Sequence, residues 1–225
     1  MRTISVIGCG QIGSAVLRGL ETLEDWQPGK VLTRRARPGA VDHTQDVGDF
    51  LSHPADLIVD TAGPDALRAI GLRALAVAPV WSVGAVAMAD PAFRSQVADA
   101  RHGLRLFACG MANMPLSARR LHITMRGPEI GHDWTGPLAQ AIPLWPDRLN
   151  TAVAAALNGP GLEATELTME RGGPDAPHEI EAEAEMAGIR WHRSIRFERR
   201  PDVPHPVAQM LLSELARASR PWQGV

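Results

Sequence analysis

Tyrosine is absent from the 225-residue sequence, and lysine occurs once, at Lys30. These two shortages argue against a Tyr/Lys proton relay, a Walker-type phosphate lysine and a Schiff-base lysine in the core. The two cysteines, Cys9 and Cys109, lie far apart and form no CxxC motif. We therefore expect two buried, small side chains in a reducing compartment, rather than a disulfide framework or a zinc site.

A strong charge of one sign and long apolar runs are also missing. The formal net charge is −2, so no basic footprint marks nucleic acid or acidic lipid as a partner. No stretch approaches the roughly 18 uninterrupted apolar residues of a membrane span. Glycines, Gln11 and Arg18 interrupt the N-terminal apolar run early, which argues against a signal peptide. The sequence predicts a globular cytoplasmic protein that binds neither membrane nor nucleic acid.

Short apolar runs alternate with helical patterns in the first half of the chain. The runs predict strands at residues 3–7, 30–33, 56–60, 80–83 and 104–108. The patterns between them predict helices at residues 11–23, 64–77 and 91–102. Such alternation is typical of a parallel sheet with crossover helices. We expect an α/β fold, with a doubly wound parallel sheet over residues 1–110.

In the second half, apolar and polar residues alternate, as in antiparallel strands with one solvated face. A strand expected at 178–186 carries four glutamates on one face. A strand expected at 189–197 has outward-facing Arg190, His192 and Arg196 and inward-facing Ile189, Trp191, Ile195 and Phe197. Helices are predicted at 146–157 and 206–218. We expect a smaller α+β domain of mainly antiparallel strands over residues 111–204, followed by a segment, 205–225, whose helix packs back on the first domain.

The segment Gly8-Cys9-Gly10-Gln11-Ile12-Gly13 fits the GxGxxG pattern, and it lies between a predicted strand and a predicted amphipathic helix. Gly8 permits a tight turn, Gly10 lets the backbone approach a pyrophosphate, and Gly13 lets helix and strand pack closely. The helix that begins at Gln11 and Ile12 adds N–H groups and a positive dipole end. The pattern predicts a dinucleotide site, and the alternative is a glycine-rich turn that binds nothing.

The acidic residue that selects NAD is missing at the end of the second strand. NAD-selective folds carry it about 20 residues after the last glycine, for the ribose 2′-hydroxyl. Here the sequence reads Thr33-Arg34-Arg35-Ala36-Arg37. Thr33 could donate a hydrogen bond to a 2′-phosphate, and Arg34 or Arg35 could make a charge-assisted, forked contact. We expect NADP as the cofactor; NAD, or a solvated arginine run without a ligand, is the alternative.

Two polar residues of the second half are candidates for chemistry. His178 shares strand parity with Ile180 and Ala182, so its imidazole should point toward the apolar side or an interdomain cleft. Histidine can take or give a proton near neutral pH. Asn150 is expected about one turn inside the helix at 146–157, where helix propensity disfavours it. A structural histidine and a solvent-facing asparagine are the alternatives. The other histidines show no paired metal-ligand spacing, so no metal site is expected.

Four segments resemble sequences of the L-aspartate dehydrogenase family, whose members are small nicotinamide-dependent amino acid dehydrogenases. The segments are VIGCGQIG at 6–13, SVGA at 82–85, WPDRLNTAVAAALNGPG at 145–161 and HEIEAEAE at 178–185. In that family the third segment looks like FPxNVNVAAALALAGPG and the fourth like HxIxxEG, in the same order and at similar spacing. The resemblance runs along nearly the whole chain and implies a Rossmann fold for the first domain.

The resemblance also implies a reaction and a set of site residues. A hydride would move from the α-carbon of aspartate to the cofactor, giving iminosuccinate, which water converts to oxaloacetate and ammonia, or the reverse. His178 matches the family's catalytic histidine and Asn150 its asparagine near the substrate. Further cofactor contacts are implied for Ala62, Ser82, Gly84 and Ala85. Related folds pair their C-terminal sheets across a two-fold axis, so a homodimer or a larger homo-oligomer is expected.

Two segments depart from the family. After the fifth strand the family reads near PSGAIGGLDAL, where this chain has ACGMANMPL at 108–116. Near the C-terminus the family reads NPKTSxLAAL, where this chain has HPVAQMLL at 205–212 and lacks the lysine. Met111, Met114 and Val207 make the expected substrate pocket more apolar. A less polar imine or carbonyl substrate in a specialised pathway therefore stays open, as does a non-catalytic dinucleotide-binding regulatory protein.

Overall fold

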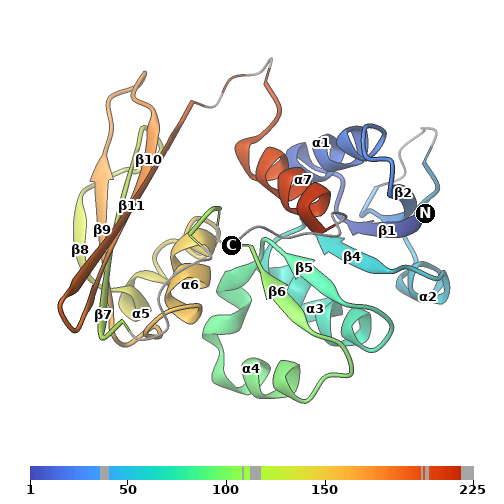
Figure 1. Ribbon diagram of the computed structural model, residues 1–225, viewed down its shortest axis with the longest axis horizontal. Helices are drawn as coiled ribbons and strands as arrows, with labels where there is room; N and C mark the ends of the chain where they lie inside the picture. The colour runs from blue at the N-terminus through green and yellow to red at the C-terminus, as the bar shows by residue number, and fades with distance from the viewer. Residues whose placement is uncertain (36–40, 108, 112–117, 199, 201–202, 219–225) are drawn as a thin grey trace. The chain divides into compact units, whose positions relative to one another are not determined.

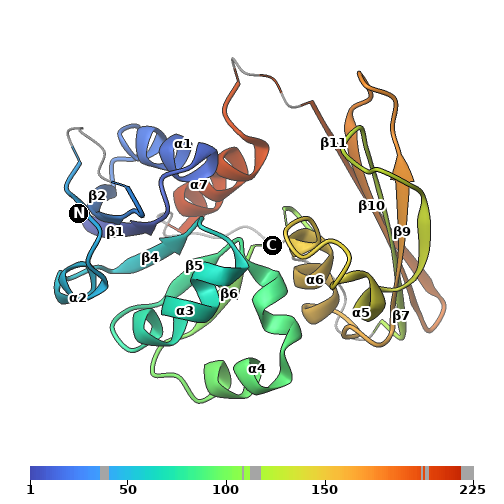
Figure 2. The same ribbon diagram turned by 180° about the vertical axis from the view of Figure 1, so that it is seen from behind.

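The computed structural model describes residues 1–35, 41–107, 109–111, 118–198, 200 and 203–218. The chain forms two compact units, one made of Met1–Leu106 together with Pro204–Val225 and the other of Phe107–Val203. Figures 1 and 2 show the elements of both units from opposite sides. Within the ranges given above, no helix is both long enough and apolar enough to cross a membrane.

The first unit is built on a six-stranded sheet with the order β3-β2-β1-β4-β5-β6, and all neighbouring strands are parallel. The strands are β1 (Arg2–Ile7), β2 (Trp26–Leu32), β3 (His43–Thr44), β4 (Leu57–Asp60), β5 (Val80–Ser82) and β6 (Leu104–Leu106). The prediction of a doubly wound parallel sheet is confirmed. Because the strand order reverses between β1 and β4, their carboxyl ends mark the switch point at which such sheets bind ligands.

Helices cover both faces of this sheet (Figure 1). On one face lie α1 (Gln11–Leu20) and α7 (Pro206–Ala218); on the other lie α2 (Val47–Ser52), α3 (Pro64–Leu75) and α4 (Pro91–Ala98). A short 3₁₀ helix, η1 (Ala85–Ala89), follows β5. The C-terminal helix packs closely on α1, because a Cβ added at Gly19 would lie 2.1 Å from Cδ1 of Leu212. The indole N–H of Trp26 also donates to the Leu215 carbonyl oxygen, at 3.2 Å.

Several boundaries in the first unit differ from those predicted. α1 ends at Leu20 rather than at residue 23, because the hydroxyl and the amide of Thr22 both donate to the Gly19 carbonyl oxygen, at 2.8 and 3.1 Å. α4 ends at Ala98 rather than at residue 102. β2 begins at Trp26, ahead of the predicted start, since Pro28 and Gly29 conceal the strand in the sequence. β3 and α2 were not predicted, because neither is long enough to show a period.

The second unit is a five-stranded mixed sheet with the order β11-β10-β7-β9-β8. The strands are β7 (Arg120–Gly127), β8 (Trp134–Pro137), β9 (Thr165–Arg171), β10 (His178–Met186) and β11 (Ile189–Phe197). Only the β7/β9 pair is parallel, so the expectation of mainly antiparallel strands is confirmed. α5 (Leu138–Ala141) and α6 (Asn150–Leu157) lie over one face of this sheet, and they bury its apolar side chains.

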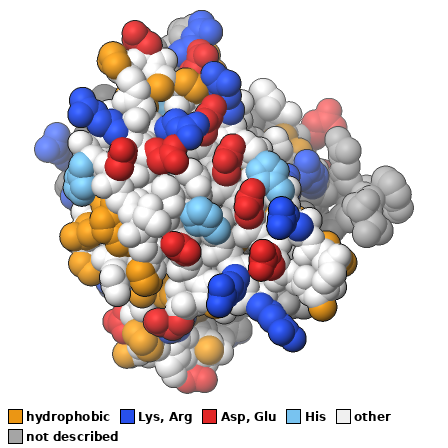
Figure 3. Space-filling view, turned by 90° about the vertical axis from the view of Figure 1, so that its left-hand side faces the viewer, with side chains coloured by type: hydrophobic (Ala, Val, Ile, Leu, Met, Phe, Trp, Pro, Cys, Tyr) orange, Lys and Arg blue, Asp and Glu red, His pale blue; other side chains and the backbone are white. Residues whose placement is uncertain are grey.

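The other face of the second sheet is open and carries charges of both signs (Figure 3). Along β10, Ala182 and Ala184 are buried while Glu183 and Glu185 are exposed, as the alternation predicts. The register places Glu185 between Arg120 and Arg190, and Glu183 between His122 and His192. Opposite charges on neighbouring strands stabilise such a face.

One inward-facing residue of the β10/β11 hairpin was predicted wrongly. The bounds of both strands agree with the predicted ranges. Ile189, however, is 60% exposed, because it opens an edge strand directly after the turn at Gly188, where φ is 76°. Trp191, Ile195 and Phe197 are half-buried, as suits a strand with a neighbour on one side only.

Candidate active site

The glycine turn between β1 and α1 lies at the carboxyl edge of the parallel sheet. Gly8 has a φ of 88°, a conformation in which any side chain is strained. Its amide donates to the Leu32 carbonyl oxygen of β2, at 2.9 Å. A Cβ at position 8 would lie 2.8 Å from the Cβ of Ala62. The turn therefore touches the loop after β4, at the switch point of the sheet.

The other two glycines of the motif have opposite surroundings. A Cβ at Gly13 would lie 2.1 Å from the Gly8 carbonyl oxygen and 2.6 Å from Oγ1 of Thr61, so this position admits only glycine. A Cβ at Gly10 would meet no atom within 4 Å. Gly10 is the exposed N-cap of α1, whose first turn, starting at Gln11 and Ile12, holds no acidic residue. An open glycine at a helix N-terminus is what a pyrophosphate requires, so these residues fit a dinucleotide.

Asp60 closes β4 and is nearly completely buried, with 1% of its surface exposed. Its carboxylate accepts hydrogen bonds from the Ser82 hydroxyl at 2.6 Å and from the Ala62 amide at 3.0 Å. Oγ of Ser82 in turn accepts from the Gly84 amide at 2.9 Å. Burial raises the pKa of Asp60 to about 6, against the effect of the two hydrogen bonds, which lower it. This network fastens the loop after β4 to the loop after β5.

The residues expected to contact the cofactor on these two loops divide into two kinds. Ala62 is exposed, whereas Ser82 and Ala85 are completely buried. A Cβ at Gly84 would lie 2.6 Å from the carbonyl carbon of Gly63, so the two loops meet backbone to backbone. Ser82, Gly84 and Ala85 thus shape the edge from inside, and Ala62 forms part of its surface.

The arginines after β2 are at the surface. Arg34 and Arg35 are exposed, and Thr33 is 8% exposed. The Thr33 hydroxyl donates to the Arg35 carbonyl oxygen at 2.7 Å, so it shapes the turn that carries the two guanidinium groups. Ala36 and Arg37 lie outside the described residues.

Lys30, which lies within β2, is a structural cation. Its ammonium nitrogen contacts both carboxylate oxygens of Asp49, at 2.8 and 2.9 Å, and Oδ2 of Asp42, at 3.3 Å. The hydrogen bonds with Asp49 raise the pKa of Lys30 and lower the pKa of Asp49. The pair fastens α2 to β2, so we assign Lys30 a structural role rather than a catalytic one.

In the second unit, His178 begins β10 on the buried side, and 15% of its side chain is exposed. Its ring stacks on Phe197 of β11, with centroids 5.1 Å apart and planes 6° apart. A Cβ at Gly127 of β7 would lie 3.1 Å from Cδ2 of the imidazole. Nε2 of His178 lies 3.5 Å from Oε2 of Glu129, in the turn after β7. The imidazole is therefore held in a defined plane beside a carboxylate.

Asn150 does not lie one turn inside its helix, as predicted, but is the first residue of α6. Residues 146–148 form a turn, closed by a hydrogen bond from the Arg148 amide to the Trp145 carbonyl oxygen at 3.1 Å. At a helix start asparagine carries little penalty. Nδ2 of Asn150 donates to the Asp147 carbonyl oxygen at 3.4 Å. Arg148, two residues before Asn150, contacts Glu129, which links this turn to His178.

The residues that set this chain apart from the family are only partly described. Met111 is buried and Val207 is half-buried, while Met114 lies outside the described residues. Cys109 is buried as expected, and burial raises the pKa of its thiol to about 11, so it stays protonated. Cys9 is half-buried rather than buried, because it lies in the glycine turn.

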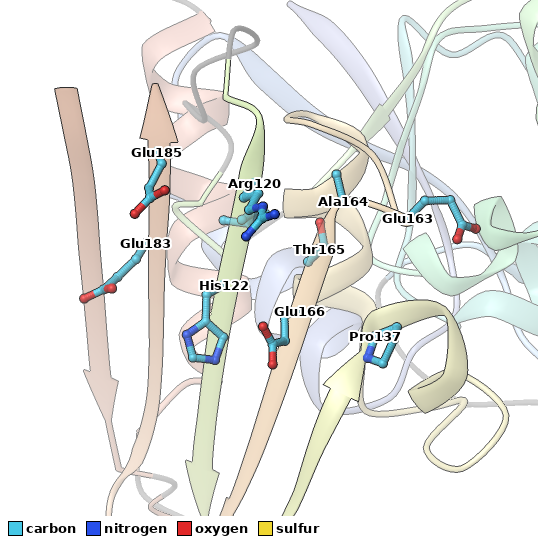
Figure 4. Close-up of a pocket in the computed structure, with 10 residues that line it drawn as sticks. Arg120, His122, Pro137, Glu163, Ala164, Thr165, Glu166, Glu183 and Glu185 are labelled. Atoms are coloured by element: carbon cyan, nitrogen blue, oxygen red, sulfur yellow. The ribbon is translucent and has the colours of Figure 1, made fainter. Parts of the chain in front are cut away.

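A pocket of about 490 Å³ lies on the open face of the second sheet. Figure 4 shows Arg120, His122, Glu166, Glu183 and Glu185 along neighbouring strands at this pocket. His178 and Asn150 are not among its lining residues. Throughout the part of the chain that the structure describes, no group of three or more histidine, cysteine, aspartate or glutamate side chains could hold a metal ion.

Sequence reasoning missed Asp60, Glu129 and Arg148. Asp60 had a signal, because a carboxylate that ends a buried strand must have hydrogen-bond partners. Arg148 lies inside the family-like segment 145–161, where the family carries asparagine. Glu129 had no signal, because only the tertiary fold brings the turn after β7 to the start of β10.

The chain is similar to known dehydrogenases over its whole length. Residues 8–105 match the family model described as homoserine dehydrogenase, NAD binding domain. The L-aspartate dehydrogenase of Ruegeria pomeroyi is 32% identical, over 95% of this chain and 90% of that protein. Aspartate dehydrogenase from Thermotoga maritima has a similar fold, with a TM-score of 0.76, 16% identity and all of both chains covered. The DAP dehydrogenase of C. glutamicum superposes with a TM-score of 0.52 at 12% identity, over 96% of this chain and 88% of that one.

Proposed function

Because the chain belongs to the L-aspartate dehydrogenase family, and is thus an NAD(P)-dependent amino acid dehydrogenase, we propose that its substrate is aspartate. In the oxidative direction the α-carbon loses a hydride and the amino group loses a proton, which leaves iminosuccinate. Water then adds to the imine carbon, and oxaloacetate and ammonia leave. The match at 32% identity over 95% of the chain carries this proposal.

Different residues of the chain would bind the cofactor, transfer the proton and orient the substrate. The dinucleotide, when bound, supplies the hydride acceptor. Gly10 would let the pyrophosphate approach the N-terminus of α1, while Gly8 and Gly13 shape the turn that presents it. His178 would take the proton from the substrate amine or from the attacking water, and Asn150 would orient the substrate or the nicotinamide carboxamide.

NADP is the form of cofactor that the chain's charges favour. Arg34 and Arg35 are exposed at the end of β2, and no acidic residue stands among residues 33–37 to repel a 2′-phosphate. A guanidinium can make two parallel hydrogen bonds with a phosphate. Thr33, whose hydroxyl is bound to the Arg35 carbonyl oxygen, would act by shaping the turn.

A second candidate function is reduction of a less polar imine or carbonyl compound. It is favoured by the buried Met111 and by the absence of lysine from residues 205–212, where the family carries one. A non-catalytic, dinucleotide-binding regulatory protein is the third candidate. For assembly, we propose a homodimer or a larger homo-oligomer, as related folds form through such sheets.

The deciding experiment follows NADPH oxidation with oxaloacetate plus ammonia, and then with a panel of other keto acids and amines. We expect turnover with oxaloacetate and ammonia, and NADP⁺ reduction with L-aspartate. Turnover with an apolar keto acid alone would favour the second candidate. Tight NADPH binding without turnover on any member of the panel would favour the third.

A pair of variants tests the proton-transfer residue. His178→Ala should lower kcat by roughly 10²- to 10⁴-fold, the usual effect of removing a general acid–base group, with NADPH affinity and Tm nearly unchanged. His178→Asn keeps some hydrogen bonding but cannot titrate, so it should also be slow. Near wild-type turnover in the asparagine variant would exclude proton transfer by His178. A lower Tm or lost NADPH binding in the alanine variant would assign His178 to packing instead, and Asn150 would become the next candidate.

A further inference from the structure

Glu129 lies between the candidate catalytic histidine and an arginine from another part of the chain. Its Oε2 is 3.5 Å from Nε2 of His178 and 3.4 Å from Nη1 of Arg148. One carboxylate oxygen therefore contacts an imidazole at the start of β10 and a guanidinium in the turn before α6. No sequence motif contains all three residues.

The position of Glu129 is fixed from two sides. It lies in a tight turn directly after β7, where the Ile130 amide donates to the Gly127 carbonyl oxygen at 3.3 Å and the Gly172 amide donates to the same oxygen at 2.9 Å. Nη1 of Arg148 also donates to the main-chain carbonyl oxygen of Glu129, at 2.9 Å. Because Arg148 contacts both the backbone and the carboxylate of Glu129, it restrains the side chain even though that side chain is 40% exposed.

Apart from a flip of roughly 180° about its Cβ–Cγ bond, the imidazole of His178 has little freedom. Phe197 covers one ring face, with planes 6° apart, and Gly127 leaves only the space of a missing Cβ beside Cδ2. Stacking defines the plane of the ring but does not decide which nitrogen carries the proton. A carboxylate beside one ring nitrogen does decide this, because it favours an N–H at that nitrogen.

We propose that Glu129 is a positioning residue for His178: it selects the ring orientation and tautomer and stabilises the imidazolium that forms when His178 takes a proton. This role rests on the proposed function, in which His178 transfers the proton. Arg148 holds Glu129 in place, and it also links this pair to the turn from which Asn150 starts α6. The Glu129 carboxylate thus contacts His178 directly and is connected through Arg148 to the turn before Asn150.

The charges around His178 favour this role. From the turn after β7 the facing group is the Glu129 carboxylate, whose Oε2 also contacts the Arg148 guanidinium. From β11 the facing group is Phe197, which is neutral. Glu179, the next residue of β10, points to the other face of the sheet, where it pairs with Arg126 and Arg196. The carboxylate lies 3.5 Å from the imidazole, and its negative charge favours the protonated form.

Three variants test the proposal by kinetics, with cofactor and L-aspartate in the oxidative direction. Glu129→Ala removes the carboxylate beside Nε2 of His178 together with its charge, and it should lower kcat by about 10- to 100-fold with little change in KM for aspartate. Glu129→Gln keeps an acceptor but loses the charge. It should be less impaired, and the acidic limb of its kcat/KM profile should move to lower pH. Glu183→Gln, which changes an exposed glutamate on the opposite face of the same strand, is the matched control and should behave as wild type.

A measurement without turnover separates the pair from the reaction. The imidazole C–H resonance of His178 is assigned by its loss in His178→Ala. It should titrate at a lower pH in Glu129→Gln than in wild type, and at the wild-type pH in Glu183→Gln. An unmoved titration together with an unmoved kinetic profile would overturn the positioning role, as would a raised KM with unchanged kcat, which would assign Glu129 to substrate binding. If His178→Ala keeps full turnover, the proton-transfer assignment itself fails. The positioning role then fails with it, even if the His178 resonance of Glu129→Gln titrates at a lower pH than that of wild type.

Discussion

Replacing Asp60 by asparagine should change how the free energy of unfolding depends on pH. In the folded chain burial raises the pKa of Asp60 from 3.8 to about 6. The native state therefore binds this proton more tightly than the unfolded state does. The stabilisation from that proton is fully present below pH 3.8 and is lost as the pH rises through about 6.

The size of the effect follows from the shift. One pKa unit corresponds to about 1.4 kcal/mol, so wild type should lose about 3 kcal/mol relative to Asp60→Asn as Asp60 ionises. Most of this loss should fall between about pH 4 and about pH 6, the window that the two pKa values define. The asparagine amide has one acceptor oxygen, so it loses one of the two hydrogen bonds that the Asp60 carboxylate accepts, and this loss adds an offset that does not depend on pH.

Urea unfolding of both proteins, followed by far-UV circular dichroism across this pH range, measures the difference. Subtracting the two curves cancels the other titrating groups, provided the variant leaves them unchanged. Asp49→Asn is the control of opposite sign, because its hydrogen bonds with Lys30 lower the pKa of Asp49, so its contribution is lost as the pH falls. A difference between wild type and Asp60→Asn that stays flat with pH would refute the burial argument for Asp60.

Three further predictions concern the cofactor and the assembly. Gly10→Ala should keep the wild-type Tm, since its Cβ meets no protein atom within 4 Å, but it should weaken NADPH binding. Gly13→Ala should weaken NADPH binding and should also lower the free energy of unfolding by about 1–3 kcal/mol. Equal Tm values for both variants would contradict this. Arg34→Ala should weaken NADPH and spare NADH in fluorescence titrations, with the exposed Arg101→Ala as control, and equal losses for both cofactors would count against NADP. Light scattering should give a dimer or larger, and one monomeric mass across micromolar concentrations would exclude it.

The elements that the sequence predicts well are those whose pattern and end signals agree. β10 and β11 alternate over their whole length and meet at Gly188, which adopts the positive φ of a tight turn. α7 begins at Pro206, a residue that suits the first turn of a helix and no later position. In each case a local signal marks the same residue at which the long-range pattern begins or ends.

Other boundaries depend on contacts that periodicity does not contain. The apolar stripe of α1 continues to Leu23, yet the helix ends at Leu20, because the Thr22 hydroxyl takes the Gly19 carbonyl oxygen. The segment before Asn150 has the composition of a helix, but it folds as a turn, and Arg148 donates to the Glu129 backbone. Side chains that bind backbone groups override propensity at both places.

The same reasoning explains which part of the candidate site could be predicted. The glycine turn is a local motif, because every residue that shapes it except Leu32, Thr61 and Ala62 lies within the motif or next to it. His178 could be placed on the buried side of its strand by parity alone. Glu129 and Arg148 could not be placed, because their contact with His178 depends on how β7, α6 and β10 assemble.

Two kinds of exception to ordinary sequence rules lie at the edge of the sheet where the dinucleotide is proposed to bind. In the first unit a carboxylate with 1% exposure ends β4, and Gly8 and Gly63 take positive φ values beside it. Burying that carboxylate lowers stability at neutral pH, yet it fixes two loops at the edge of the sheet where a dinucleotide would lie. On the open face of the second sheet, by contrast, the exposed Glu185 lies in water between Arg120 and Arg190, as general rules require. An unfavourable buried charge persists only where the surrounding structure holds it, so its place at the switch point of the sheet supports a role for Asp60 in keeping the cofactor loops together.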